Sequence, residues 1–407
     1  MRRTQDWLRN LTFVLLAASL TLSISPRLLA CPFCSPPGPT LAEEMATAKV
    51  VLFAKLVERR EAKPPQALPP AKFAITQVLK GGKELNGARQ IEVLHVGDEP
   101  VGSLFYCIAD EATEEPDVTT PVAKGLVWSQ PIMIDDDAQR YLGKLFELPA
   151  QGAERLRFVL EFLEAEAPSL REDAYSEFAK APYADVKDLK DHLRRETLLV
   201  AIENPYLDVR LRRLYLTLLG ICGTNDDLTR LETWMKSDQP AMKASLDAIV
   251  ACYLTLRGEA GLEQVECDVL RRPGVEFNDI YAAVLALRFH GEEERRIPRA
   301  KLAQTMASLL NRPQTAELVI ADLARWQEWG SQEPLAKLFE QSTGDDAWIR
   351  VPIVQYFHAC PEPKAKEQLA VFKEIDPQSV KLGTSPLPLA RRPGESRLPP
   401  ASREERD

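Results

Sequence analysis

Residues 204–223 (NPYLDVRLRRLYLTLLGICG) carry the clearest secondary-structure signal in the sequence. Proline is accepted in a first helical turn, where its missing N–H would have no partner, so Asn204-Pro205 is the predicted helix start. Five leucines fall at helical spacing and form one apolar face, three arginines are expected largely off that face, and two glycines end the helix. These residues are Leu207, Leu211, Leu214, Leu218 and Leu219; Arg210, Arg212 and Arg213; and Gly220 and Gly223.

Similar helix starts recur through the second half of the chain, in irregular steps of 32 to 38 residues, at Asp208, Pro240, Asn278, Pro313 and Asp345. A period of roughly 35 to 40 residues with two helices per unit predicts an α-solenoid; an ordinary helical bundle with coincidental spacing is the alternative. The Asp-Val-Arg start, the leucine face and the Leu-Gly end resemble the second helix of a HEAT-type repeat. This resemblance implies an architecture for residues 168–375, and no activity.

Composition narrows the class of protein. The chain has 407 residues, enough for two or more domains with a sizeable core. Its net charge of -9 argues against a nucleic-acid partner, which would require a basic face. A hydrophobic content of 45%, low glycine content and many helix formers favour a mostly helical globular protein. The fold class expected is therefore a multidomain α+β protein in which helices predominate.

Residues 1–30 are predicted to be an export signal. Arg2 and Arg3 precede the apolar run Leu11–Ile24, which is short for a bilayer span of about 20 residues. The alternatives are an uncleaved membrane anchor and lipidation of Cys31, because residues 28–31 (LLAC) resemble a bacterial lipobox. In each case the mature chain is expected in the periplasm or cell envelope, where disulfides persist.

Residues 31–130 are expected to form a small antiparallel β-barrel or sandwich. Short strand-like segments alternate with turn formers, after a short helix Leu41–Ala48 capped by Thr40. The expected strands are Lys49–Glu58, Ala71–Leu79, Arg89–Val96, Gly102–Ile108 and Gly125–Ser129. Residues 131–167 are assigned to connecting helices, the first of which starts at Asp135–Asp137. A single helix is predicted over Val186–Glu203, and residues 376–407 read as a disordered tail rich in proline and arginine.

The β-domain resembles the netrin-like, OB-type barrel of the metalloprotease inhibitors known as TIMPs. The residues that carry this resemblance are the N-terminal cysteine motif, the first strand AKVVLFAKLVE (Ala48–Glu58) and the segment FAITQVLKG (Phe73–Gly81). The whole layout also resembles uncharacterised bacterial exported proteins that open with a CPFC segment and continue into degenerate HEAT-like helices. In the inhibitors, the amino group and carbonyl of the first cysteine chelate the zinc of the target protease, a role that would fall on Cys31.

Cysteine spacing leaves several roles open for Cys31, Cys34 and Cys107. The CPFC pair at 31–34 is compatible with a disulfide from Cys31 or Cys34 to Cys107, with a redox dithiol, with half of a zinc site, or with lipidation of Cys31. The disulfide is the preferred interpretation, because no strand precedes the pair and no second metal-binding pair completes it. The remaining cysteines, Cys222, Cys252, Cys267 and Cys360, are expected to be free and buried in helices.

No catalytic or cofactor-binding motif is evident, so no catalytic, cofactor-binding or metal-binding residue is assigned. We therefore expect a non-catalytic scaffold for an unidentified protein partner in the cell envelope. The first alternative is a metalloprotease inhibitor that acts through Cys31. The second is a thiol oxidoreductase that uses Cys31 and Cys34.

Overall fold

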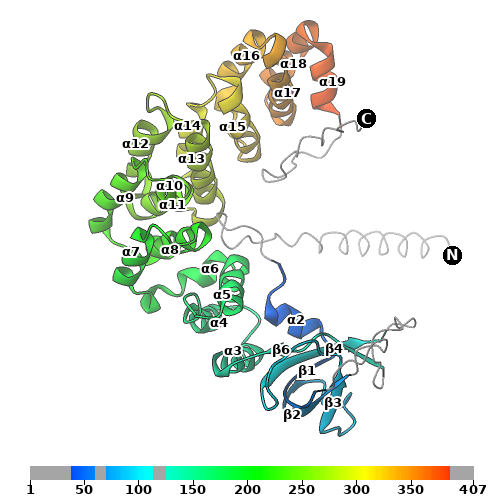
Figure 1. Ribbon diagram of the computed structural model, residues 1–407. Coiled ribbons are helices and arrows are strands. Elements are labelled where there is room, and N and C mark those ends of the chain that lie inside the picture. The colour runs from blue at the N-terminus through cyan, green and yellow to red at the C-terminus, as the bar shows by residue number, and fades with distance from the viewer. Residues whose placement is uncertain (1–37, 60–69, 113–124, 386–407) are drawn as a thin grey trace, which may run out of the picture. The chain divides into compact units, whose positions relative to one another are not determined.

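The computed structural model describes residues 38–59, 70–112 and 125–385, and the chain divides into two compact units (Figure 1). Unit 1 comprises Met1–Leu193 and unit 2 comprises Arg194–Asp407. Unit 1 contains an antiparallel sheet and several helices, whereas the described part of unit 2 is helical. The fold is thus mixed α+β, as the sequence predicted.

The sheet of unit 1 curls into a nearly closed barrel. Its strands follow the spatial order β3-β2-β1-β4-β5, every pairing is antiparallel, and β6 pairs with β4 beside this path. The bounds are β1 Val50–Glu58, β2 Ala71–Lys80, β3 Gln90–Val93, β4 Leu104–Glu111, β5 Leu126–Trp128 and β6 Ile132–Met133. The five predicted strands are confirmed, whereas β6 lacks a recognisable pattern because it has only two residues.

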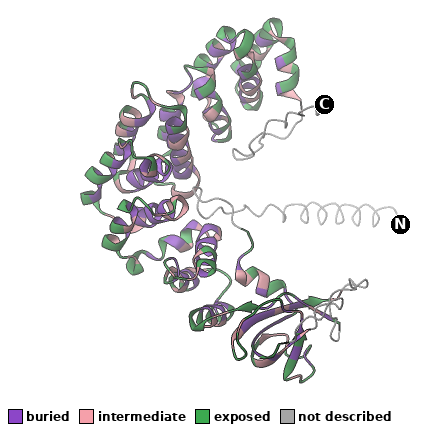
Figure 2. Cartoon of the chain, viewed as in Figure 1, coloured by how far each residue is buried: buried purple, intermediate pink, exposed green. Residues whose placement is uncertain are grey.

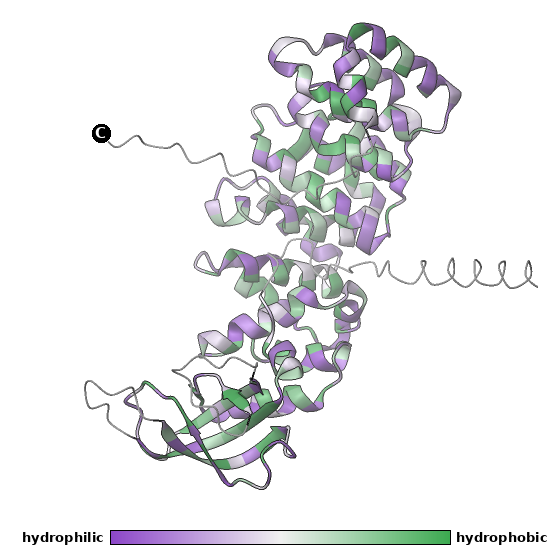
Figure 3. Cartoon of the chain, turned by 90° about the vertical axis from the view of Figure 1, so that its right-hand side faces the viewer, coloured by the Kyte–Doolittle hydropathy of each residue, from purple (hydrophilic) through white to green (hydrophobic). Residues whose placement is uncertain are grey.

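The barrel core is built on β1, which lies between β2 and β4. A central strand pairs on both edges, and six of the first seven residues of β1 are buried. Phe73 on β2 and Phe105 on β4 pack edge to face in the interior, with ring centroids 5.2 Å apart. Figure 3 colours the strands by hydropathy, and both hydrophobic and hydrophilic residues occur along them.

The helices of unit 1 are α2 Leu41–Thr47, α3 Asp136–Glu147, α4 Ala153–Leu160, α5 Pro168–Lys180 and α6 Tyr183–Lys187. The predicted caps are confirmed. Thr40 and Glu43 form a reciprocal capping box at α2, and the Asp135 carboxylate accepts from the Ala138 N–H at α3. Helix α4 ends six residues before the predicted boundary at Glu166.

The predicted helix over Val186–Glu203 is wrong. Helix α6 ends at Lys187, a 3₁₀ turn covers Lys190–His192, and α7 begins at Arg195. Leu189 is fully buried at this break, and the boundary between the two units follows at residue 193. The run contains no glycine or proline, the residues that usually mark a helix break, so no local pattern indicates this one.

Unit 2 is a succession of helices joined by short connections. They are α7 Arg195–Glu203, α8 Val209–Cys222, α9 Leu228–Met235, α10 Pro240–Lys243, α11 Leu246–Arg257, α12 Leu262–Val265, α13 Phe277–Phe289, α14 Arg299–Ala307, α15 Pro313–Arg325, α16 Gln332–Gln341, α17 Arg350–Ala359, α18 Pro363–Ile375 and α19 Pro377–Thr384. Helix α8 packs on α11, α11 on α13, α13 on α15, α15 on α17 and α17 on α19. Buried residues gather along these contacting helices (Figure 2).

Helix α8 differs from the prediction at its start and at one arginine. Its N-cap is Asp208, whose carboxylate accepts from two backbone N–H groups, whereas Asn204-Pro205 lies in the preceding turn. Arg212, expected largely off the apolar face, is fully buried. Its guanidinium donates to the carbonyl oxygens of Ile202 and Asn204, at the end of α7, and of Ala241. The burial of Arg212 was not predicted because these carbonyl partners come from other elements.

The predicted disordered tail is partly wrong, because α19 occupies Pro377–Thr384. The Asp376 carboxylate caps this helix and also accepts from Arg350 on α17, at 3.1 Å. Gly383 is buried so closely against α17 that an added Cβ would lie 2.5 Å from Cγ1 of Val354. Tertiary packing thus orders a segment whose composition predicted disorder, while residues 386–407 lie outside the described residues.

Candidate functional site

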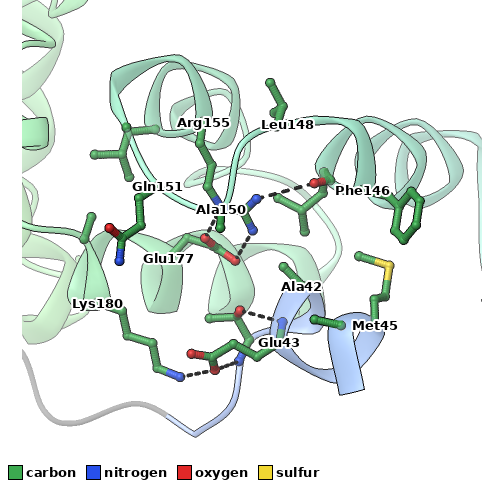
Figure 4. Close-up of a pocket in the computed structure, with 16 residues that line it drawn as sticks. Ala42, Glu43, Met45, Phe146, Leu148, Ala150, Gln151, Arg155, Glu177 and Lys180 are labelled. Atoms are coloured by element: carbon green, nitrogen blue, oxygen red, sulfur yellow. Dashed lines mark hydrogen bonds and ion pairs between the residues drawn. The ribbon is translucent and has the colours of Figure 1, made fainter. Parts of the chain in front are cut away.

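A pocket of about 350 Å³ lies in unit 1, between α2, the connection from α3 to α4, and α5 (Figure 4). Its volume is at the lower end of the range for small-ligand pockets. Most of its wall is apolar, and four charged side chains from α2, α4 and α5 complete it. The lining residues are Thr40, Ala42, Glu43, Met45, Ala46, Leu145, Phe146, Leu148, Ala150, Gln151, Gly152, Arg155, Leu156, Glu177, Lys180 and Ala181.

A buried ion pair joins α4 to α5 at this pocket. The Arg155 guanidinium donates through Nε and Nη2 to the two carboxylate oxygens of Glu177, at 2.6 and 2.7 Å. Its third nitrogen, Nη1, donates to the carbonyl oxygens of Leu145 and Pro149. Burial lowers the pKa of Arg155, but the hydrogen bond and charge of Glu177 outweigh it and hold the pKa above its ordinary value. Each nitrogen of the guanidinium is therefore engaged.

A second ion pair, Glu43 with Lys180, lies at the same pocket and connects α2 to α5 (Figure 4). The Glu43 carboxylate also accepts from the Thr40 N–H, as part of the capping box of α2. Burial raises the pKa of Glu43, but its hydrogen bonds to Lys180 and Thr40 together lower the pKa by more than burial raises it. The net shift of the pKa is therefore downward. Glu43 is therefore ionised at neutral pH, and it ties the start of α2 to the end of α5.

Asp173, on α5, holds the N-terminus of α2 to the helices of unit 1. Its Oδ1 accepts from the backbone N–H of Leu41, and its Oδ2 accepts from the Tyr141 hydroxyl, each at 2.7 Å. Burial raises the pKa of Asp173 to about 6, despite these two donors. Burial and the negative charge of Asp173 also raise the pKa of Tyr141, which keeps that phenol protonated. The Asp173 carboxylate is thus the hydrogen-bond acceptor for the N-terminus of α2, which lies 132 residues away in sequence.

The four charged side chains of the pocket form two ion pairs, Arg155 with Glu177 and Glu43 with Lys180. Each of its charged side chains is paired with one of opposite charge, and no cysteine, serine or histidine lines it. Within residues 38–59, 70–112 and 125–385, no group of three histidine, cysteine, aspartate or glutamate side chains is arranged to hold a metal ion. A neutral, apolar group therefore complements the pocket best, because it leaves both ion pairs intact.

Of the three cysteines singled out from the sequence, Cys107 alone is among the described residues. Cys31 and Cys34 lie outside the described residues, and Cys107, on β4, is a free thiol buried in the barrel core. Burial raises the pKa of Cys107 to about 12, so this thiol is not reactive at neutral pH. The expected disulfide from Cys31 or Cys34 to Cys107 therefore stays a prediction, one that a free and buried Cys107 does not support.

The other cysteines follow the prediction only in part. Cys252 and Cys360 are free and buried as expected, Cys222 is partly buried, and Cys267 is an exposed free thiol. Among the aromatic residues of the last helices, Trp326, Tyr356 and Phe357 are buried in the packing. Trp348, in contrast, is 40% exposed.

The residues that shape the pocket were missed from the sequence. Arg155 lies four residues before Val159, hence on the apolar side of its helix, and this position is the one available signal that the charge is buried. Its partner Glu177 is 22 residues away and Asp173 acts on a helix 132 residues away. Such pairings depend on how the helices pack.

No family model matches the chain, and no curated protein matches it significantly. In the described part of the chain, no helix has the length and apolar character needed to cross a membrane.

Proposed function

We propose that this protein is a non-catalytic scaffold of the cell envelope, and that unit 2 is a degenerate HEAT-like α-solenoid that binds another protein. The observation that carries this proposal is the succession of contacts α8–α11–α13–α15–α17–α19, in which each helix packs on the next. Solenoids are built from such nearest-neighbour contacts, and they offer extended surfaces to partners.

Ion pairs between successive units support the same proposal. Arg195 pairs with Asp227, Arg213 with Asp247, and Arg288 with Asp322, at sequence separations of 32, 34 and 34 residues. These separations agree with the steps of 32 to 38 residues between the predicted helix starts. The ion pairs and the helix starts involve different residues, so the agreement is between two separate observations. The additional bond from Gln314 to Asp346 also spans 32 residues. An ordinary helical bundle would not be expected to repeat a similar sequence separation between bonded residues.

Tyr206 is the residue of unit 2 best placed to test partner binding. It is 94% exposed, in the turn between α7 and α8. Its N–H donates to the side chain of Asn204, whose carbonyl oxygen accepts from the buried Arg212. An exposed aromatic ring on an anchored turn loses little entropy on binding, and aromatic residues are frequent interface hot spots.

The test begins with cross-linking in the producing cell, identification of the partner, and binding measurements with both purified proteins. The variant Tyr206→Ala should weaken binding about tenfold, the effect of a moderate hot spot. Val101→Ala, a truncation of a 60%-exposed side chain in unit 1, is the matched control and should leave affinity unchanged. The scaffold proposal fails if the purified protein turns over a substrate and single substitutions abolish that activity.

Metalloprotease inhibition remains a second candidate because of the sheet. A nearly closed barrel in which β1 pairs with both β2 and β4 is compatible with an OB-type, netrin-like domain. The test is an assay against zinc proteases, using protein with a free amine on Cys31 and the same protein acetylated there. Inhibition that is equal in both forms would exclude zinc chelation by Cys31. No described residue favours the thiol oxidoreductase hypothesis, whose two cysteines lie outside the described residues.

Export is tested by mass spectrometry of the mature N-terminus, with and without reduction. A free Cys31 would mean cleavage after Ala30 and an exported soluble protein. An acylated Cys31 would mean a lipoprotein anchored to the membrane, and would exclude the inhibitor candidate because its amine would be blocked. An intact residue 1 would mean that the signal segment is retained as an anchor.

A further inference from the structure

The pocket of unit 1 has room for a ring and walls that suit one. An apolar cavity of about 150 Å³ holds one benzene ring, so about 350 Å³ accommodates a phenyl group with part of its neighbour. Met45, Leu145 and Leu156 are buried on its wall, and its ion pairs are satisfied without a ligand. The complementary occupant is therefore aromatic or aliphatic and carries no charge.

The described chain begins beside this pocket. Gly38 is the first described residue, and Thr40, two residues later, lines the cavity. Asp173 and Lys180 fix the start of α2 there, through Leu41 and Glu43. The chain that precedes Gly38 is therefore tethered to the protein two residues from the pocket wall at Thr40.

One aromatic residue lies within that reach. The segment Cys31–Gly38 (CPFCSPPG) contains Phe33, five residues before Gly38, and no charged side chain. Five residues span at most about 17 Å, more than the width of a side-chain pocket. Residues 31–37 lie outside the described residues.

We propose that the pocket is the receptor site for the chain's own Cys31–Cys34 segment, with the phenyl ring of Phe33 as its occupant. A neutral segment complements a cavity whose charges are already paired, and the short tether gives Phe33 a high effective concentration at the site. Phe33 then holds the cysteine pair against unit 1. The proposal is independent of partner binding by unit 2.

The experiment places the photo-cross-linker benzoylphenylalanine at position 33 of the full chain and maps its products by mass spectrometry. We expect cross-links within one chain to α2, α5 or the connection from α3 to α4. Filling the pocket with Ala150→Trp should reduce them at least tenfold, because Ala150 lines the cavity and is itself exposed, so a larger side chain is tolerated there. Val101→Trp, at an exposed site away from the pocket, is the matched control and should leave the cross-links unchanged.

A second measurement avoids the photo-cross-linker and the added tryptophan. Amide hydrogen exchange of α2 should be about tenfold faster in Phe33→Ala than in the unsubstituted chain, whereas exchange in α13 of unit 2 should not change. Equal exchange of α2 in both proteins would overturn the proposal, as would cross-links that persist in Ala150→Trp. Cross-links between two chains would also overturn it, and would instead assign the pocket to a second copy.

Discussion

The two units hold their helices together in different ways. Unit 1 uses a few side-chain bonds between residues far apart in sequence, such as Asp173 with Leu41 and Lys180 with Glu43. Several bonds in unit 2 join residues 32 to 34 positions apart in sequence, much closer than these pairs of unit 1. Damage to one bond should therefore spread through unit 1 but stay local in unit 2.

The buried arginines make this difference specific. Arg155 in unit 1 has a carboxylate partner, Glu177, which neutralises its charge. Arg212 in unit 2 has no carboxylate partner among its bonds and donates to three carbonyl oxygens, two of them at the end of α7. A helix C-terminus carries partial negative charge, which favours a cation there. Burial nevertheless lowers the pKa of Arg212.

The largest effect is expected from Glu177→Gln. This substitution keeps the shape of the side chain but leaves the buried Arg155 without a counter-charge, which should lower the free energy of unfolding by about 3 to 5 kcal/mol. Denaturant unfolding followed by amide exchange should show loss of protection in α2, α4 and α5. The double variant Arg155→Met, Glu177→Leu is the control, because replacing both charges with apolar groups should recover most of the stability.

The next effect is a pH dependence caused by Asp173. Burial raises its pKa to about 6 in the folded protein, against an ordinary value of 3.8, so the folded state holds the proton more tightly than the unfolded state. The contribution of Asp173 to stability is therefore greatest below about pH 4 and falls by about 3 kcal/mol as pH rises through 6. Unfolding measured from pH 4 to 7.5 should show this decrease in the unsubstituted chain and lack it in Asp173→Asn. Parallel curves for the two proteins would contradict it.

Arg212→Met should cost about 2 kcal/mol, because it removes charged donors from buried carbonyl oxygens while nearly preserving volume. Exchange should increase in α7, α8 and α10, and α15 to α19 should remain protected if coupling passes only between neighbours. A uniform loss of protection across unit 2 would mean that it unfolds as one cooperative block. Arg210→Met, at a partly exposed position on the same helix, is the matched control.

The smallest expected effects have opposite signs at two helical glycines. Gly383→Ala should destabilise α19 by about 1 to 3 kcal/mol, since its Cβ would lie 2.5 Å from Val354 Cγ1. Gly143→Ala, in α3 of unit 1, meets no atom within 4 Å and should stabilise the protein by about 0.5 to 1 kcal/mol through helix propensity. Thermal unfolding of both variants checks the signs. If Gly383→Ala is neutral, α19 is not packed as described.

Local patterns predicted much of the fold. The strands alternate or are apolar enough to be recognised, and the caps at Thr40 and Asp135 use bonds within three residues. The predictions were wrong where contacts with residues distant in sequence determine the local structure. Arg212 was placed largely off the apolar face because its carbonyl partners come from other elements. Residues 376–385 were assigned to the tail because their packing on α17 has no local signature. The pocket was missed for the same reason, since its residues come from four parts of unit 1.

The bond from Asp173 to Leu41 also has a consequence for the order of folding. A chain synthesised or threaded through a membrane from its N-terminus presents α2 and β1 long before α5. The start of α2 therefore waits for its acceptor until about 130 further residues have emerged. Contacts of such sequence separation form slowly because a long loop must close first. The pocket is consequently among the last features of unit 1 to be completed.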